Sequence, residues 1–148
     1  MVSHVNHRDT LETLLVSSNR LIRIAAQATG SRTPSAIWRT LGILDTDGPM
    51  RIGELAVASR VTQPGMTRVL ATMVEEELVS RIADVEDSRA WLIRITPKGR
   101  DALHAWRHQI ANALEPWFAD LADDEWATLQ RAVELMAART ASDLAVSA

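Results

Sequence analysis

The sequence contains no cysteine, so it offers no thiolate for a disulfide, a metal site or a redox switch. No apolar run approaches the length of a membrane span, and the first eight residues lack an apolar core followed by a cleavage site. We therefore expect a soluble, cytoplasmic protein. A glycine-rich phosphate loop, a nucleophile elbow and a metalloprotease histidine pair are also missing. With no catalytic centre indicated, we expect neither an enzyme nor a cofactor.

Bulk positive charge is missing too, because the 148 residues carry a formal net charge of −3. That charge is uneven: residues 1–50 and 51–100 each carry +1, whereas residues 101–148 carry −5. A chain of this length can build one packed protomer but hardly two independent cores. If the middle of the chain binds a polyanion, the affinity must come from a local face.

The amino-terminal part of the chain predicts two helices. Apolar residues recur at helical spacing from Leu11 to about Thr29, and Gly30 follows as a stop. Thr33 then predicts an N-cap, with Pro34 at the first helical position of a second, shorter helix.

The middle of the chain predicts a helix-turn-helix. A small helix includes Leu55 and Ala56, and Thr62 caps the next helix with Pro64 in its first turn. The buried side of that second helix is formed by Met66, Val69, Leu70, Met73 and Val74. The outward positions are Gln63, Gly65, Thr67, Arg68 and Thr72.

The period then changes. Residues 79–83 and 89–95 are rich in β-branched and aromatic residues, and the polar stretch 84–88 separates them, which predicts a hairpin. A helix-turn-helix followed by a hairpin is the layout of a winged DNA reader. We therefore predict a mainly α fold with a small antiparallel β-wing, and a reader lobe over residues 33–96.

Two long amphipathic helices close the chain. The first starts at Thr96-Pro97 and runs as one stripe to Leu121 with a kink at Pro116, and the second starts at Asp123. Together with the first helix they present three apolar faces outside the winged unit. Residues 1–148 form a single protomer too small to cover them, so we expect segments 9–30 and 97–145 to pack against a second copy.

Five short segments follow one another in a specific order and spacing: Glu54-Leu55-Ala56, Thr67-Arg68-Val69-Leu70, Leu78-Val79-Ser80-Arg81, residues 84–89 and residues 92–99. With these segments the chain resembles the MarR family of winged helix-turn-helix transcriptional regulators, over nearly its whole length. The resemblance implies an obligate homodimer, and a repressor that a small, often phenolic, ligand releases from its operator.

Two positions depart from the family pattern. The family usually has a glycine between the recognition helix, which here is the helix capped by Thr62, and the wing. This chain has Glu77 at that position, so we expect the helix to end in another way. Gly65 occupies an outward place where a DNA-contacting side chain is more common. A glycine there weakens the helix but lets the backbone approach DNA closely.

The resemblance and the outward positions together predict the DNA contacts. Arg68 is expected to pair with guanine or with a phosphate. Arg89 is expected to enter the minor groove, with Asp87 holding it in position. Alternatively, Asp87 and Arg89 form only a solvated pair within the turn. A twofold axis would place the two recognition helices ~34 Å apart, so the operator should be an inverted repeat. The predicted contact set is Thr62 (phosphate, or only the helix cap), Gln63, Gly65, Thr67, Arg68, Thr72 and Arg89.

Three alternatives concern ligands and partners. For an aromatic effector, Trp38 is the best candidate, with Arg39 or Arg8 as the cation for a carboxylate, although an aromatic residue at such a position is more often part of the core. For zinc, His104 and His108 stand four apart on a helix, and His4 or His7 would have to complete the site. A winged helix used only for protein contacts is the third alternative. The remaining tryptophans, Trp91, Trp106, Trp117 and Trp126, we assign to the wing, the core or dimer contacts.

Overall fold

The computed structural model describes residues 6–143 and is mainly helical, with one small antiparallel sheet. Backbone contacts group the elements into two compact units, one extending to Ala113 and the other starting at Leu114. Within residues 6–143 no helix is long and apolar enough to cross a membrane. The elements are α1 (His7–Thr29), α2 (Ser35–Asp47), β1 (Met50–Arg51), α3 (Ile52–Ser59), α4 (Gln63–Glu75), β2 (Val79–Ala83), β3 (Trp91–Ile95), α5 (Pro97–Leu114), a 3-10 turn (Glu115–Trp117) and α6 (Asp123–Asp143).

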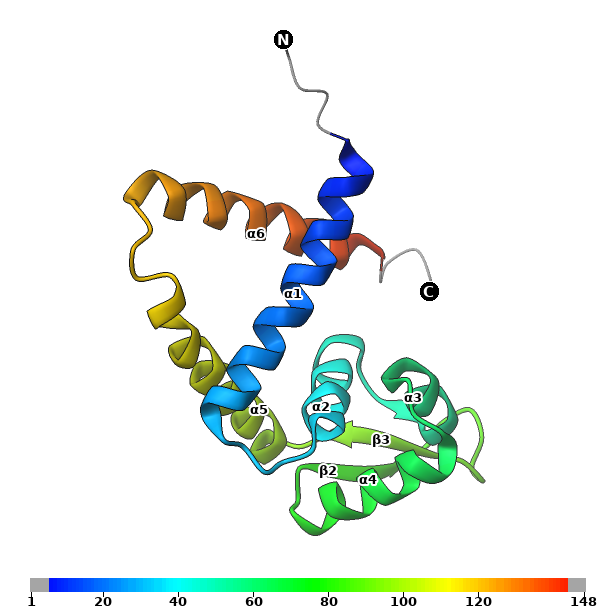
Figure 1. Cartoon of the computed structure of the whole chain (residues 1–148). Coiled ribbons are helices and arrows are strands. Elements are labelled where there is room, and N and C mark those ends of the chain that lie inside the picture. Colours follow the sequence, from blue (N-terminus) through cyan, green and yellow to red (C-terminus); the bar gives the residue numbers. More distant parts are fainter. Residues whose placement is uncertain (1–5, 144–148) are drawn as a thin grey trace. The chain divides into compact units, whose positions relative to one another are not determined.

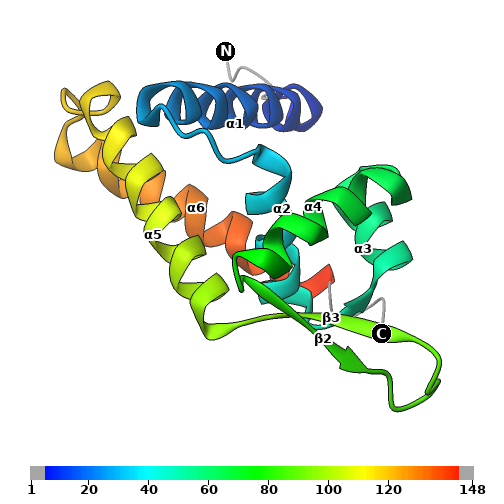
Figure 2. The same cartoon turned by 90° about the horizontal axis from the view of Figure 1, so that it is seen from below.

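The core of the first unit lies between α2, α3, α4, the sheet and the start of α5 (Figure 1). The strand order is β1-β3-β2, and the hairpin register pairs Val79 with Ile95 and Ala83 with Trp91. Figure 2 shows the tip of this hairpin extending beyond α3 and α4. Of the five residues predicted to be buried on α4, Met66, Leu70 and Met73 are buried and Val69 is partly buried, whereas Val74, in the last turn of the helix, is 38% exposed, so that assignment is wrong. The fully buried apolar side chains around the sheet are Leu41, Leu44, Leu55, Met66, Leu70, Met73 and Leu103. The predicted winged fold is confirmed.

Several predicted boundaries are wrong. The second helix starts at Ser35, and Pro34 takes the extended cap position without a side-chain hydrogen bond. The predicted kink at Pro116 is a helix end, because α5 stops at Leu114 and a 3-10 turn follows. Strand β1 was not predicted, because two residues give no readable periodicity. Trp91 was expected to pack within the wing but is 59% exposed.

Three helices of the first unit end in the same way. After α1, α3 and α4 the chain adopts a left-handed conformation, at Gly30 (φ 58°), Arg60 (φ 56°) and Glu77 (φ 60°). In α3 and α4 the two hydrogen bonds of a Schellman motif accompany it, for example Leu78 N–H to Met73 O at 2.8 Å. The expectation that Glu77 requires a different helix end is therefore wrong. The glycine geometry is kept, at a cost of roughly 1 kcal/mol for a residue with a side chain.

The second unit consists of the turn after α5 and helix α6. Phe118 and Trp126 lie with ring centroids 6.1 Å apart and close the turn onto the helix. Trp126 is nevertheless 46% exposed and Val133 50% exposed, so about half of each of these apolar side chains on α6 is accessible to solvent.

Candidate nucleic-acid interface

Helix α4 begins with the predicted cap. The Thr62 hydroxyl accepts a hydrogen bond from the Gly65 backbone N–H at 3.1 Å, which satisfies one of the free donors of the first turn. This cap also bears on Gly65, because a Cβ at that position would lie 3.0 Å from the Thr62 hydroxyl oxygen. A side chain at position 65 would therefore crowd the cap.

The outward face of α4 is polar and exposed, as predicted. Gln63, Thr67, Arg68 and Thr72 all lie on it, opposite the buried residues of the helix. The Thr67 hydroxyl donates to the Gln63 carbonyl oxygen at 3.0 Å, so only its acceptor capacity remains free for an outside partner. The structure thus brings four of the predicted contact residues together on one surface.

The start of the hairpin loop, directly after β2, is fixed by an ion pair that the sequence did not reveal. Arg51 donates from Nε (2.9 Å) and Nη2 (2.6 Å) to one carboxylate oxygen of Asp84. The other Asp84 oxygen accepts from the Glu86 backbone N–H at 2.9 Å. The Glu86 N–H, followed by the Arg51 guanidinium, lowers the pKa of Asp84 below its ordinary 3.8. No spacing rule connects positions 51 and 84, so only the fold could show this pair.

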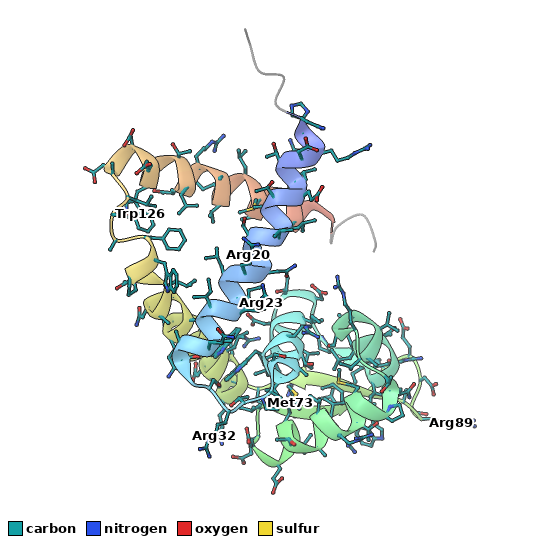
Figure 3. All side chains as sticks on the ribbon, viewed as in Figure 1. Arg20, Arg23, Arg32, Met73, Arg89 and Trp126 are labelled. Carbon is teal, nitrogen blue, oxygen red and sulfur yellow. The ribbon has the colours of Figure 1, made fainter. Side chains whose placement is uncertain are left out.

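At the tip of the hairpin, Asp87 holds Arg89 through the backbone. An Asp87 carboxylate oxygen accepts from the Arg89 backbone N–H at 3.0 Å, and the Asp87 carbonyl accepts from Ala90 N–H at 2.9 Å. In the described part of the chain no ion pair joins the two side chains. The Arg89 side chain is exposed and projects at the end of the wing (Figure 3). Asp87 therefore orders the turn and leaves the guanidinium available.

The state of the Asp84 carboxylate should set how firmly the wing is anchored. We expect Asp84→Asn to lower the urea midpoint at pH 7, because an amide cannot pair with the charge of Arg51. Since the pKa of Asp84 is lowered, the stabilisation is present above pH 3.8 and is lost as the pH falls through that lowered pKa. Urea midpoints of the variant and the unaltered chain should therefore converge as the pH falls below 3.8 and the Asp84 carboxylate becomes protonated.

Glu86→Gln is the control for this test, because Glu86 contributes only its backbone N–H to the site. It should leave the midpoint at pH 7 nearly unchanged. If Asp84→Asn lowered the urea midpoint by the same amount at every pH, the stabilisation could not come from the ionised Asp84 carboxylate paired with Arg51.

The candidate effector residues have contacts of their own. Trp38 stacks on Trp106 of α5, with centroids 5.0 Å apart and planes 9° apart. Its buried indole Nε1 has no hydrogen-bond partner among the described residues. Arg39 donates from Nη1 to the Ser59 carbonyl oxygen at 2.9 Å. Arg8 lies in the exposed first turn of α1, and within residues 6–143 no hydrogen bond joins it to Trp38 or Arg39.

Among the described residues, the histidine pair on α5 gains no further ligand. His104 and His108 are both exposed, and residues 6–143 contain no group of three histidine, aspartate or glutamate residues that could hold a metal ion. His7 is exposed at the start of α1, and His4 lies outside the described residues. The zinc alternative therefore receives no support from the arrangement of side chains.

Comparison with known proteins points to one family. The model described as "MarR family" matches residues 35–91. The uncharacterized HTH-type transcriptional regulator Mb0904 of Mycobacterium bovis is 33% identical over 98 residues, which cover 66% of this chain and 68% of that protein. The uncharacterized HTH-type transcriptional regulator YpoP of Bacillus subtilis is 33% identical over 89 residues, covering 60% and 63%.

Solved structures agree on the fold. The transcriptional regulator Tm0710 from Thermotoga maritima aligns with a TM-score of 0.72 and 18% identity, covering 93% of this chain and 98% of that one. Wild-type MarR from E. coli aligns with a TM-score of 0.66 and 18% identity, covering 84% and 94%. At these identities the likeness shows the winged fold alone.

Proposed function

Because this chain belongs to the MarR family of transcriptional regulators, we propose that it binds an inverted-repeat operator in duplex DNA as a homodimer, acts as a repressor, and is released by a small aromatic ligand. One observation supports DNA reading most directly. The polar outward face of α4 carries Arg68, the tip of the wing carries Arg89, and in the described part of the chain neither arginine is neutralised by an acidic partner.

The chemistry of that surface suits a duplex. A helix that presents polar side chains can enter the major groove, where each base pair offers a distinct set of donors and acceptors. Arg89 at the tip of an ordered turn suits the negative potential of a narrow minor groove. Gln63, Thr67 and Thr72 are the proposed polar readers of α4, and Gly65 permits close backbone approach beside the Thr62 cap.

The homodimer is supported by apolar side chains that the single chain leaves uncovered. On α1, Leu11 is 59%, Leu15 66% and Ile22 57% exposed. On α6, Trp126 and Val133 are about half exposed. Exposed apolar side chains grouped on a helix in this way favour a protein–protein contact, and a second copy supplies the same surfaces through a twofold axis.

The proposed effector site rests on Trp38. A flat aromatic ligand stacks well on an indole, and the unpartnered Trp38 Nε1 could donate to an acceptor on such a ligand. Arg39 bonds the Ser59 carbonyl oxygen through Nη1, and its other N–H groups could bind a ligand carboxylate, which would couple ligand binding to the turn that precedes α4.

A titration of the full chain with fluorescent mixed-sequence duplex at about 50 mM and about 200 mM salt tests DNA binding. We expect binding that weakens steeply with salt, as phosphate contacts release counterions. Absence of binding at both salt concentrations would contradict the proposal and favour a module that contacts only proteins.

A further inference from the structure

The turn between α3 and α4 holds a charged side chain where the backbone favours glycine. Arg60 has φ 56° and ψ 42°, and it closes the Schellman motif of α3 with hydrogen bonds from Arg60 N–H to Val57 O (3.1 Å) and from Val61 N–H to Ala56 O (3.0 Å). A glycine would occupy this left-handed position without the steric strain of a Cβ.

The two equivalent helix ends of the same unit show how unusual Arg60 is. After α1 the position is Gly30, which avoids the strain. After α4 it is Glu77, whose carboxylate pairs with Lys98 Nζ at 3.2 Å. Arg60 is exposed, and within residues 6–143 it has no acidic partner. Nothing within the described chain accounts for an arginine at this strained position.

The turn is also held firmly in place. Arg39 of α2 donates to the carbonyl oxygen of Ser59, the residue before Arg60, at 2.9 Å. The Ser59 hydroxyl lies 3.2 Å from the Thr40 hydroxyl, and both residues are 0% exposed. The backbone next to Arg60 is therefore bonded to α2, and the exposed Arg60 side chain extends from a backbone position that is held in place.

We propose that Arg60 contacts a DNA backbone phosphate at the entrance to the recognition helix. This inference rests on the proposed function and adds a contact that the sequence pattern did not nominate. Arg60 lies three residues before Gln63, where α4 begins, and both views place the start of α4 at the same end of the unit as the wing tip with Arg89 (Figures 2 and 3). A guanidinium can bind a phosphate through two parallel hydrogen bonds. Such a contact fixes register on the duplex without reading sequence.

The variant Arg60→Gly separates the conformational effect of this residue from its proposed DNA contact, because the substitution should raise thermal stability but lower DNA affinity. It should unfold at a higher temperature than the unaltered chain, since the left-handed strain is removed. It should also bind every duplex more weakly. Because a homodimer carries two copies of Arg60, the variant binds two fewer phosphates. The slope of the logarithm of the binding constant against the logarithm of the salt concentration should therefore become less steep by about 1.8. The affinity loss should then be roughly tenfold larger at about 50 mM than at about 200 mM salt.

Glu77→Gly is the matched control, because it relieves the same strain at the other end of α4. It should raise the unfolding temperature and keep the full salt dependence. Arg60→Lys, which keeps the charge, should also keep that salt dependence. If the unaltered chain binds DNA with strong salt dependence and Arg60→Gly binds equally well, only this inference fails. If the unaltered chain does not bind, the proposed function fails with it.

Discussion

Replacing Gly99 with alanine is expected to destabilise the protein by about 3 kcal/mol or more, because among the six glycines an added Cβ meets its closest obstacle at Gly99. Gly99 lies buried in the first turn of α5, and a Cβ there would overlap the Leu78 carbonyl oxygen and lie 2.9 Å from its carbon. That carbonyl cannot shift freely, because it accepts a hydrogen bond from Thr96 N–H at 3.0 Å. Urea unfolding measured by circular dichroism gives the change in free energy.

Gly42→Ala is the control for the Gly99 prediction. Gly42 lies inside α2, where an added Cβ would meet only Arg107 Nη2 at an ordinary 3.6 Å. Alanine should raise stability there by roughly 0.5–1 kcal/mol through its helix propensity. A Gly99→Ala variant as stable as Gly42→Ala would show that α5 does not pack against the start of β2 in this way.

The second large effect concerns binding. Arg89→Ala should reduce affinity about tenfold or more on every duplex, because it removes the guanidinium from the tip of the wing without disturbing the turn. The turn itself is ordered by Asp87 through the backbone N–H of Arg89, which alanine retains. Anisotropy titrations on several duplexes, with thermal unfolding measured in parallel, distinguish weaker DNA binding from incomplete folding.

Arg94→Ala provides the control of equal charge for Arg89. Arg94 is exposed near the opposite end of β3 from the tip, and it lines a hollow with Leu44 and Pro49. The Arg94→Ala variant should bind duplex DNA almost as tightly as the unaltered chain. Equal losses for the two variants would mean that overall charge, rather than the wing, determines affinity.

Features set by neighbouring residues were predictable from the sequence. The hydroxyls of Thr62 and Thr96 cap α4 and α5, by accepting from the backbone N–H of Gly65 and Gly99 respectively. The alternation of buried and outward residues in α4 also follows from helical period alone. Such local rules are sufficient to locate the recognition helix and the hairpin along the chain.

What the sequence did not reveal depends on contacts between distant positions. The Arg51–Asp84 pair joins β1 to the wing over 33 residues, and the Trp38–Trp106 stack joins α2 to α5. Arg39, considered only as a ligand cation, instead bonds the turn after α3. Periodicity and capping rules describe one element at a time, so they carry no information on such pairs.

The left-handed ends of α3 and α4 show a different limit. Glycine is the usual sign of this helix end, and its absence at Glu77 suggested another geometry. The Schellman hydrogen bonds and the packing around them impose the conformation on residues that disfavour it. Backbone strain of this kind is visible only in three dimensions, and at Arg60 it draws attention to a side chain that the sequence pattern does not single out.

Selection of duplexes from a random-sequence pool by the 148-residue chain tests the central claim most directly. If two copies read DNA through α4 and the wing, the enriched sites should be inverted repeats whose half-site centres lie about one helical turn, ~34 Å, apart. Enriched sites without twofold symmetry, or no enrichment over the starting pool, would contradict the account.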